Sequence, residues 1–204
     1  MKLPKQRTPK ELAFQRKLKR CFDIFLSIFA MLILFIPLLF LCICIKISAP
    51  KESVFYWSKR IGKFNRPFNM TKFRSMYSTA PEVATSLLQD PHSHLTPLGS
   101  FLRRSSLDEL PQLWSILKGD MSFVGPRPSL ESEVELNELR EKYGVFDLTP
   151  GLTGWAQING RDELSLTEKV QREAQYLKVQ SFAFDLKIIW DTFWYVLHRK
   201  DISH

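Results

Sequence analysis

Two adjacent carboxylates and an arginine between two prolines lie close together in the chain, between Ser105 and Pro128. The carboxylates are Asp108 and Glu109. In Gly125-Pro126-Arg127-Pro128 the prolines restrict the backbone dihedrals, so the Arg127 guanidinium leaves the turn in a nearly preset direction. Carboxylates that can hold a divalent cation, beside a rigidly mounted arginine, suit a substrate that carries phosphate.

The same carboxylates also fit the start of a helix. Ser106 and Glu109 have the spacing of a capping box, and acids favour helix N-termini. Pro111 complicates this arrangement, because it would fall at the fifth helical position and remove a hydrogen bond. Adjacent helical residues point about 100° apart, so one acid could attack a substrate while the other binds a metal ion or a proton. The spacing alone favours capping over catalysis and leaves both open.

Three further cations, Lys72, Arg74 and Arg161, are candidates for binding phosphate. Lys72 shares one face of a predicted strand with Arg74, since strand side chains alternate. That pair could hold a phosphate or form a solvated face, and the spacing favours the solvated face. Arg103 lies near the end of a predicted short helix, and Arg161 follows an Asn-Gly turn signal.

Charge and motif content narrow the function classes. The 204 residues include 29 basic and 21 acidic side chains, which gives a net charge of +8. This balance favours polyanionic partners, and nucleic acid, acidic lipid and nucleotide sugars all meet that description. The sequence contains no phosphate-binding loop, dinucleotide fingerprint, HExxH motif or serine nucleophile elbow. The three cysteines have no metal-ligand spacing with histidine and indicate a reducing compartment.

The first 49 residues have the composition of a membrane segment behind a basic arm. Residues 1–20 contain eight basic side chains and one acid, as expected of a segment held by anionic headgroups. Residues 28–45 then carry no charge, and these 18 residues are just enough for a helix that spans a bilayer. We therefore divide the chain into a basic arm (1–20), a membrane helix (21–49) and a cytosolic, membrane-associated domain (50–204).

Two features argue against an ordinary membrane span. Pro37 lies in the middle of the apolar run, where it removes one helical hydrogen bond and favours a kink. Residues 46–74 carry eight basic side chains, as many as residues 1–20, so the positive-inside tendency would keep both ends in the cytoplasm. A re-entrant helix that enters one leaflet, breaks near Pro37 and returns meets that demand. A proline-kinked span with a basic external loop is an equal alternative on these residues.

The rest of the chain predicts a mixed α/β fold, mostly helical with a small β-hairpin or sheet. Strand character over Ser53–Trp57 and Phe68–Met76, with a turn between them, indicates the hairpin. Helices are predicted for residues 129–143 and 165–178. The last helix, Phe182–Lys200, is rich in Trp and Tyr, which suits an amphipathic helix at the membrane interface or, alternatively, core packing.

Four segments together resemble the bacterial sugar transferase family. They are KFRSM (Lys72–Met76), SLDELPQL (Ser106–Leu113), KGDMSFVGPRP (Lys118–Pro128) and PGLTGWAQINGR (Pro150–Arg161). The likeness covers roughly residues 17–200, with the motifs in the family's order. The members it resembles are the monotopic phosphoglycosyl transferases, which start glycan assembly on polyprenyl phosphate. This chain looks like their minimal form, without the multi-helix N-terminal extension of larger members.

The resemblance implies a two-step exchange at the cytoplasmic face of the bacterial inner membrane. Asp108 matches the family's nucleophilic aspartate, which attacks the sugar-linked phosphorus of a UDP-sugar and releases UMP. The phosphosugar then passes to undecaprenyl phosphate, as the first membrane step of glycoconjugate assembly. Glu109 matches the second acid of the dyad. Mg²⁺ is the implied metal ion, with Asp108 and Glu109 as its protein ligands.

The resemblance also extends to residues around the acids. Lys72, Arg103, Arg127 and Arg161 match basic residues that would hold phosphates. Glu173 falls where relatives often carry aspartate, so its link to the site is weaker. Relatives often have Ser-Pro at the break of the membrane helix. This chain has Ile36-Pro37, so the bend would rest on Pro37 and the flanking charges.

The implied partners are a UDP-sugar, undecaprenyl phosphate and a phospholipid membrane, without nucleic acid, and a homodimer is left open. An alternative of a different class is a membrane-anchored basic protein that binds anionic lipid or nucleic acid without catalysis. Ligand binding with a steep salt dependence and no UMP release would identify that alternative.

Overall fold

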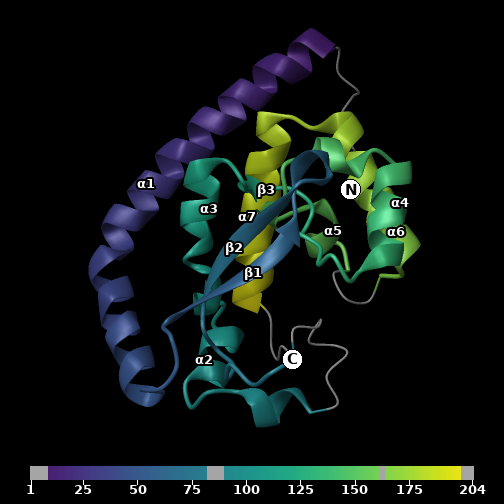
Figure 1. The fold of residues 1–204 in the computed structure, drawn as a ribbon. Coiled ribbons are helices and arrows are strands. Elements are labelled where there is room, and N and C mark those ends of the chain that lie inside the picture. Colours follow the sequence, from purple (N-terminus) through teal and green to yellow (C-terminus); the bar gives the residue numbers. More distant parts are fainter. Residues whose placement is uncertain (1–8, 82–89, 161–163, 199–204) are drawn as a thin grey trace.

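The computed structural model describes residues 9–81, 90–160 and 164–198. Its longest element is helix α1 (Pro9–Ser48), which curves along one side of the other elements (Figure 1). Among the described residues, α1 is the one helix long and apolar enough to cross a membrane, by its length and composition. The elements that follow, in chain order, are β1 (Phe55–Ile61), η1 (Lys63–Asn65), β2 (Pro67–Phe73), η3 (Pro91–His94), α2 (Gly99–Arg104), η4 (Leu107–Glu109), α3 (Gln112–Lys118), β3 (Ser122–Val124), α4 (Val134–Lys142), η5 (Val145–Asp147), β4 (Gly151–Thr153), α5 (Trp155–Ile158), α6 (Leu166–Val179) and α7 (Phe182–His198). The fold is therefore mostly helical with small sheets, as predicted.

Helix α1 differs from the predicted membrane helix in two respects. It begins at Pro9, inside the predicted basic arm, and it continues through Pro37, so the predicted break is not seen. A proline removes only one intrahelical hydrogen bond, and here the helix packs on the domain on both sides of it. Leu34 contacts one hydrophobic cluster and Leu38 contacts the next. These contacts explain why the helix continues, and the re-entrant course stays a prediction.

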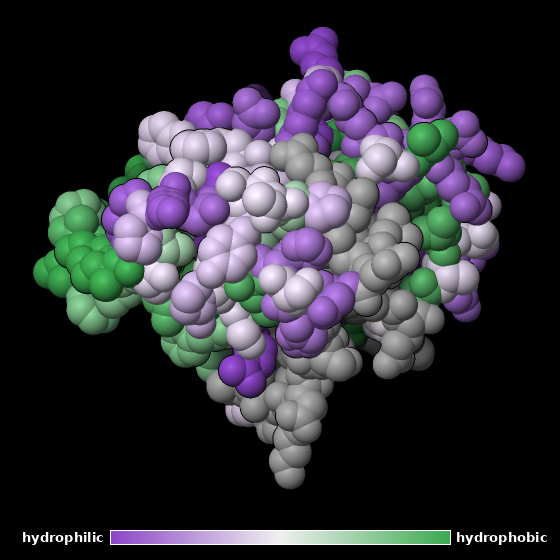
Figure 2. All heavy atoms as spheres, turned by 60° about the horizontal axis from the view of Figure 1, so that its bottom comes forward, coloured by the Kyte–Doolittle hydropathy of each residue, from purple (hydrophilic) through white to green (hydrophobic). Residues whose placement is uncertain are grey.

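One face of α1 lies against the domain along most of its length. Lys19, Asp23, Ser27 and Ile45 are buried, and apolar residues between them pack on α3, β2 and α2. The opposite face, which we name the apolar flank, exposes Phe25, Ile28, Phe29, Leu32, Ile33, Phe35, Ile36, Leu39, Phe40, Ile43 and Ile47. The hydrophobic projection at the left of Figure 2 belongs to this flank, beside a mostly hydrophilic face. One side of the helix therefore packs against the protein, and the opposite side is apolar and exposed.

The N-terminal part of α1 is fastened to the domain by polar bonds. The buried Lys19 ammonium donates to Val124 O (2.8 Å) and to Asp185 Oδ2 (2.9 Å). Asp23 accepts a hydrogen bond from the Phe123 amide, rather than pairing with a neighbouring cation. Arg20 donates to two carbonyls of the last turn of α3, where helical carbonyls lack intrahelical partners. Three polar residues near the start of the apolar segment thus hold it to the domain.

Strands β1 and β2 form the predicted hairpin. They are antiparallel, and Tyr56 lies opposite Lys72. Because side chains alternate along a strand, Ser58, Arg60 and Lys72 share one face and Lys59 lies on the other. The face with Ser58 and Arg60 is turned toward the protein, whereas Lys59 is exposed. The hairpin therefore directs two cations inward.

Strands β3 and β4 form a second, parallel pair in a region for which no strands were predicted. Ser122 lies opposite Gly151, and Val124 lies opposite Thr153. A Cβ atom on Gly151 would lie 2.1 Å from the amide nitrogen of Gly125, so glycine is needed for this close approach of two backbones. Strands of three residues show too little alternation to be recognised in a sequence.

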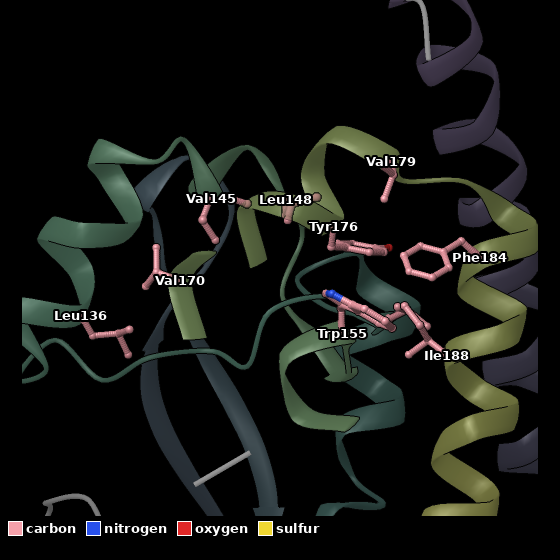
Figure 3. Packing of buried hydrophobic residues seen from close by; sticks show 11 residues of the cluster. Leu136, Val145, Leu148, Trp155, Val170, Tyr176, Val179, Phe184 and Ile188 are labelled. Carbon is pink, nitrogen blue, oxygen red and sulfur yellow. The ribbon is translucent and has the colours of Figure 1, made fainter. Parts of the chain in front are cut away.

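Helices α4 to α7 enclose the main hydrophobic core (Figure 3). Helix α4 begins later than predicted, at Val134, and α6 begins at Leu166 with a complete capping box from Ser165 and Glu168. In the core the Trp155 ring lies 5.2 Å from the Phe184 ring, measured between centroids. Tyr176 also points toward Phe184, from α6. This core joins α5 and α6 to α7, which also contacts α1.

The aromatic end of α7 is not part of that core. Trp190 is 59 % exposed, and Phe193, Trp194 and Tyr195 are also exposed. Core packing of these rings, one of the two alternatives from the sequence, is therefore wrong.

Candidate active site

Asp108 lies in the turn η4, not in a capped α-helix. Ser106, the expected N-cap, has a left-handed backbone (φ 57°), and its side chain makes no capping hydrogen bond. The capping box predicted at Ser106 and Glu109 is therefore wrong. A helix starting at Ser106 would need the amide hydrogen that Pro111 lacks. The chain instead forms a short 3-10 turn and starts α3 after the proline, at Gln112.

Lys72, on strand β2 of the hairpin, lies beside the two acids Asp108 and Glu109. Its ammonium lies 2.7 Å from Glu109 Oε1 and 3.9 Å from Asp108 Oδ2. Asp108 is buried, with 8 % of the residue exposed. Burial raises the pKa of Asp108 above its ordinary value; the charge of Glu109 adds to the rise, while Lys72 and Arg103 oppose it. Glu109 thus makes the short contact with Lys72, and Asp108 lies farther from that ammonium.

Arg127 is an exposed side chain on a buried turn. Pro126 and Pro128 on either side of it are buried. The Gly151 amide donates to Pro126 O (2.8 Å), and the Gly125 amide donates to Thr153 O (2.8 Å). The turn is thus fixed by β4. Within the described residues Arg127 makes no hydrogen bond or ion pair, so its guanidinium is available to a ligand.

Several cations surround Arg127. Burial lowers the pKa of Arg60, Arg103 and Lys169, and the positive charge of Arg127 lowers each of them further. Asp108 and Glu109 act on Arg103 in the opposite direction. Positive charges gathered in this way stabilise a bound anion.

An open pocket connects these groups. Its volume is about 280 Å³ with its solvent-open part included, and its lining residues are Arg60, Met70, Lys72, Glu109, Gln112, Arg127, Pro128, Gly151 and Leu152. Asp108 adjoins it through Lys72 and Glu109. The pocket therefore has cations from the hairpin and from the Pro-Arg-Pro turn, and carboxylates at η4. Such a set suits a phosphorylated substrate that reacts with a carboxylate.

The other residues predicted for the site each lie in different surroundings. Glu173 is buried and forms a two-bond ion pair with Arg140 (2.8 and 2.6 Å), and its part in the site stays a prediction. Arg74 donates to Ser53, and therefore does not join Lys72 on a ligand. Arg161 lies outside the described residues. Ile36 and Pro37 belong to α1 and do not line the pocket.

Sequence reasoning missed Arg60 and Gln112. Arg60 lies on β1, on the same hairpin face as Lys72, and its Nε donates to Ser58 Oγ (2.9 Å). The strand was predicted to end at Trp57, so Arg60 lay outside it; strand alternation places Arg60 on that face only because β1 continues to Ile61. No comparable signal exists for Gln112, which lies at the start of α3 and becomes part of the pocket only through the fold.

Comparison with known proteins identifies the family. Residues 14–199 match the family described as bacterial sugar transferase. The chain is 40% identical over 193 residues to the exopolysaccharide production protein ExoY of Rhizobium meliloti, with 85% of this chain and 83% of that protein covered. It is 35% identical over 199 residues to the UDP-galactose-lipid carrier transferase of Erwinia amylovora (90% of this chain, 41% of that protein). The identity is 36% over 184 residues to the UDP-glucose:undecaprenyl-phosphate glucose-1-phosphate transferase of Escherichia coli (87% and 39%).

The chain thus spans about two fifths of the length of the Erwinia and Escherichia relatives, but most of the Rhizobium one. The family match covers nearly all of this chain, including the hairpin, the acid pair and the Pro-Arg-Pro turn. The chain belongs to the bacterial sugar transferase family.

Proposed function

We propose that this protein transfers a sugar 1-phosphate from a UDP-sugar to undecaprenyl phosphate, through a covalent intermediate on Asp108. The observation that carries the proposal is the buried carboxylate of Asp108 beside a pocket lined by Arg60, Lys72 and Arg127. The names of the Erwinia and Escherichia relatives, which describe transferases acting on lipid carriers, support the same reaction class.

The reaction proceeds as two displacements at one phosphorus. First, a carboxylate oxygen of Asp108 forms a bond to the sugar-linked phosphorus, and the bond to the bridging oxygen breaks, so that UMP leaves with the electron pair. Next, an oxygen of undecaprenyl phosphate forms a bond to that phosphorus, and the bond to Asp108 breaks, which restores the carboxylate. Because the transfer takes two steps, the soluble donor and the lipid acceptor need not be bound at the same time. The positive charge of Lys72 reduces the repulsion between the carboxylates of Glu109 and Asp108 and the diphosphate of the UDP-sugar.

Mg²⁺ is part of this proposal. Among the described residues, no group of three or more His, Cys, Asp or Glu side chains could enclose a metal ion. Mg²⁺ commonly takes one or two protein carboxylates together with substrate phosphates, and the donor set of Asp108 and Glu109 fits that mode. The ion would neutralise charge on the diphosphate and on the departing UMP.

For the membrane we propose insertion of α1 into one leaflet, with the domain at the cytoplasmic face of the bacterial inner membrane. Near one end of the apolar segment Lys19 bonds to Asp185, and at the other end Ile45 packs with Phe73 and Leu102. Both ends are thus held by the same domain, which supports a helix whose two ends stay on one side of the membrane. The exposed rings of α7, with Trp190 the most exposed, suit the headgroup region.

Release of UMP tests the reaction. Membranes containing the full chain are incubated with a panel of UDP-sugars, undecaprenyl phosphate and Mg²⁺. UMP should appear with one or a few of the sugars, and Asp108→Asn should abolish it. Undiminished release from Asp108→Asn would remove the nucleophile assignment. Salt-sensitive binding of anionic lipid or nucleic acid, without UMP from any donor, would favour the non-catalytic alternative.

A further inference from the structure

Arg60 is a partly buried cation that makes two hydrogen bonds among the described residues. It lies on the inward face of β1, where its Nε donates to Ser58 Oγ and its Nη1 to Pro128 O at 3.4 Å. Its Nη2 makes no hydrogen bond within the described part of the chain. Burial lowers the pKa of Arg60 and the charge of Arg127 lowers it further, while Glu133, Tyr56 and Glu109 act in the opposite direction.

Arg60 and Arg127 both line the pocket, from different parts of the fold. The turn that carries Arg127 is held against the hairpin, because the Ile61 amide donates to Ser129 O (2.9 Å). The two guanidiniums are therefore presented to the same space by rigid backbone. Paired guanidiniums with free N–H groups bind the oxygens of a phosphate well.

We infer that Arg60 and Arg127 form a single phosphomonoester subsite, which holds UMP as it departs and then polyprenyl phosphate as it enters. This inference rests on the proposed function. UMP and polyprenyl phosphate are both phosphate monoesters. In an in-line displacement the leaving group of the first step and the nucleophile of the second step both lie opposite Asp108 on the same phosphorus. One subsite facing Asp108 across the pocket therefore serves both.

Lys59 provides a matched control for Arg60. It is the preceding residue on β1, carries the same charge and lies on the opposite face, with 62% of its side chain exposed. Its ion pair with Glu131 is at the surface, where such pairs contribute little. Lys59→Gln thus removes one positive charge from the same strand without touching the pocket.

Binding measurements on the full chain in detergent micelles test the inference without turnover. We expect Arg60→Gln to weaken binding of both UMP and a short-chain prenyl phosphate by about tenfold or more, as for loss of a charge-assisted hydrogen bond. Arg60→Lys should fall between wild type and Arg60→Gln, and Lys59→Gln should bind both ligands as wild type does. The two ligands should also compete. Equal binding by Arg60→Gln, weakening for one ligand only, or simultaneous binding of both would overturn the shared subsite.

The variants also separate this inference from the proposed function. Asp108→Asn should bind both monoesters and release no UMP from UDP-sugar. If Asp108→Asn is inactive while Arg60→Gln binds normally, the subsite fails and the function stands. If Asp108→Asn stays active, the proposed mechanism fails whatever Arg60→Gln does. Arg60→Lys keeps the test valid should Arg60→Gln fold poorly.

Discussion

Asp108 combines two properties that oppose each other, burial and negative charge. Its pKa is raised by burial, so the folded state holds the neutral form more readily than the unfolded state does. A raised pKa of an acid means that the charged form destabilises the fold above that pKa, and that this penalty disappears as the pH falls through it. The charged form of Asp108, the proposed nucleophile, therefore lowers the stability of the fold.

We predict that Asp108→Asn melts at a higher temperature than wild type at pH 8, while it has lost activity. A gain of roughly 1 kcal/mol would raise Tm by about 2–4 °C in a chain of this size. The gain should shrink at lower pH, because wild-type Asp108 then becomes neutral as well. The measurement is a thermal melt at pH 8 and pH 5 in the same detergent. Asp147→Asn, at an exposed aspartate, should show no such gain, and a lower Tm for Asp108→Asn at pH 8 would contradict the argument.

Glu173 illustrates a different use of a buried acid. Its ion pair with Arg140 is almost fully buried and has two short bonds. Removing one partner leaves the other charge uncompensated, which typically costs about 3–5 kcal/mol, whereas replacing both by apolar residues is often tolerated.

We therefore predict that Glu173→Leu alone strongly lowers Tm and that Glu173→Leu combined with Arg140→Met recovers most of the loss. Thermal melts measure the stability, and UMP release per folded molecule measures the activity. A double variant that is stable but inactive would indicate that Glu173 acts in the active site. Recovery of both stability and activity would indicate that its role is structural.

For individual residues, the sequence indicated which residue types belong to the candidate site, but not which hydrogen bonds and ion pairs they form. The motifs indicated Asp108, Glu109 and Lys72 as site residues, and these three side chains lie together. The capping box failed because Pro111 interrupts the helix that it required. Arg60 was missed because its neighbourhood depends on the pairing of the hairpin with the Pro-Arg-Pro turn, which are far apart in sequence.

Among the elements, α1 and β3 are coupled by the buried Lys19. Its ammonium bonds both to Asp185 on α7 and to the carbonyl of Val124, three residues before Arg127. Asp185 also accepts a hydrogen bond from the Tyr176 hydroxyl. Burial raises the pKa of Asp185, and Lys19 opposes that rise.

We predict that Lys19→Met lowers the free energy of unfolding by about 3–5 kcal/mol near neutral pH, because Asp185 is left as a buried charge without its cation. Loss of Lys19 should raise the pKa of Asp185 further, so protonation removes the penalty at a higher pH than in wild type. The Tm deficit should therefore be larger at pH 8 than at pH 5. Lys17→Met, two residues away and exposed, is the control. A deficit independent of pH would show that packing, not charge, is responsible.

Elements of six or more residues were mostly predictable, whereas the three-residue strands were not. The α2, α6 and α7 helices are found where they were predicted, and so is the hairpin, except that β1 runs to Ile61, four residues beyond the predicted end of that strand. The parallel pair β3 and β4 was missed because its pairing depends on two close backbones and not on a hydrophobic pattern. At Pro37 the local tendency to break was outweighed by packing on both sides, a tertiary effect that a sequence window does not contain.

In the whole molecule, the helix that carries the apolar flank packs on residues that also line the charged pocket, such as Met70. From Phe25 to Ile47 an α-helix rises by about 33 Å, roughly the thickness of a bilayer core. If α1 crossed the bilayer, the hairpin and α2, which pack on its second half, would be drawn into hydrocarbon. The open edges of a two-stranded sheet and charges such as Lys72 make that costly. Insertion into one leaflet avoids this cost.

This arrangement predicts that both ends of the apolar flank face the same side of the membrane. In a cysteine-free background, a nitrobenzoxadiazole dye is attached at Phe25→Cys, Ile36→Cys or Ile47→Cys, and the protein is inserted into preformed vesicles with the domain outside. Dithionite, which does not cross the membrane, should bleach the dyes at 25 and 47 at rates within about twofold of each other. The dye at 36, at the middle of the exposed flank, should bleach more slowly because it lies deepest. Dye at Lys59→Cys, on the exposed face of the hairpin, should bleach fully and so fixes the orientation of the domain. A spanning helix would instead protect one end entirely, and protection at 25 or 47 with full bleaching at 59 would rule out insertion from one side.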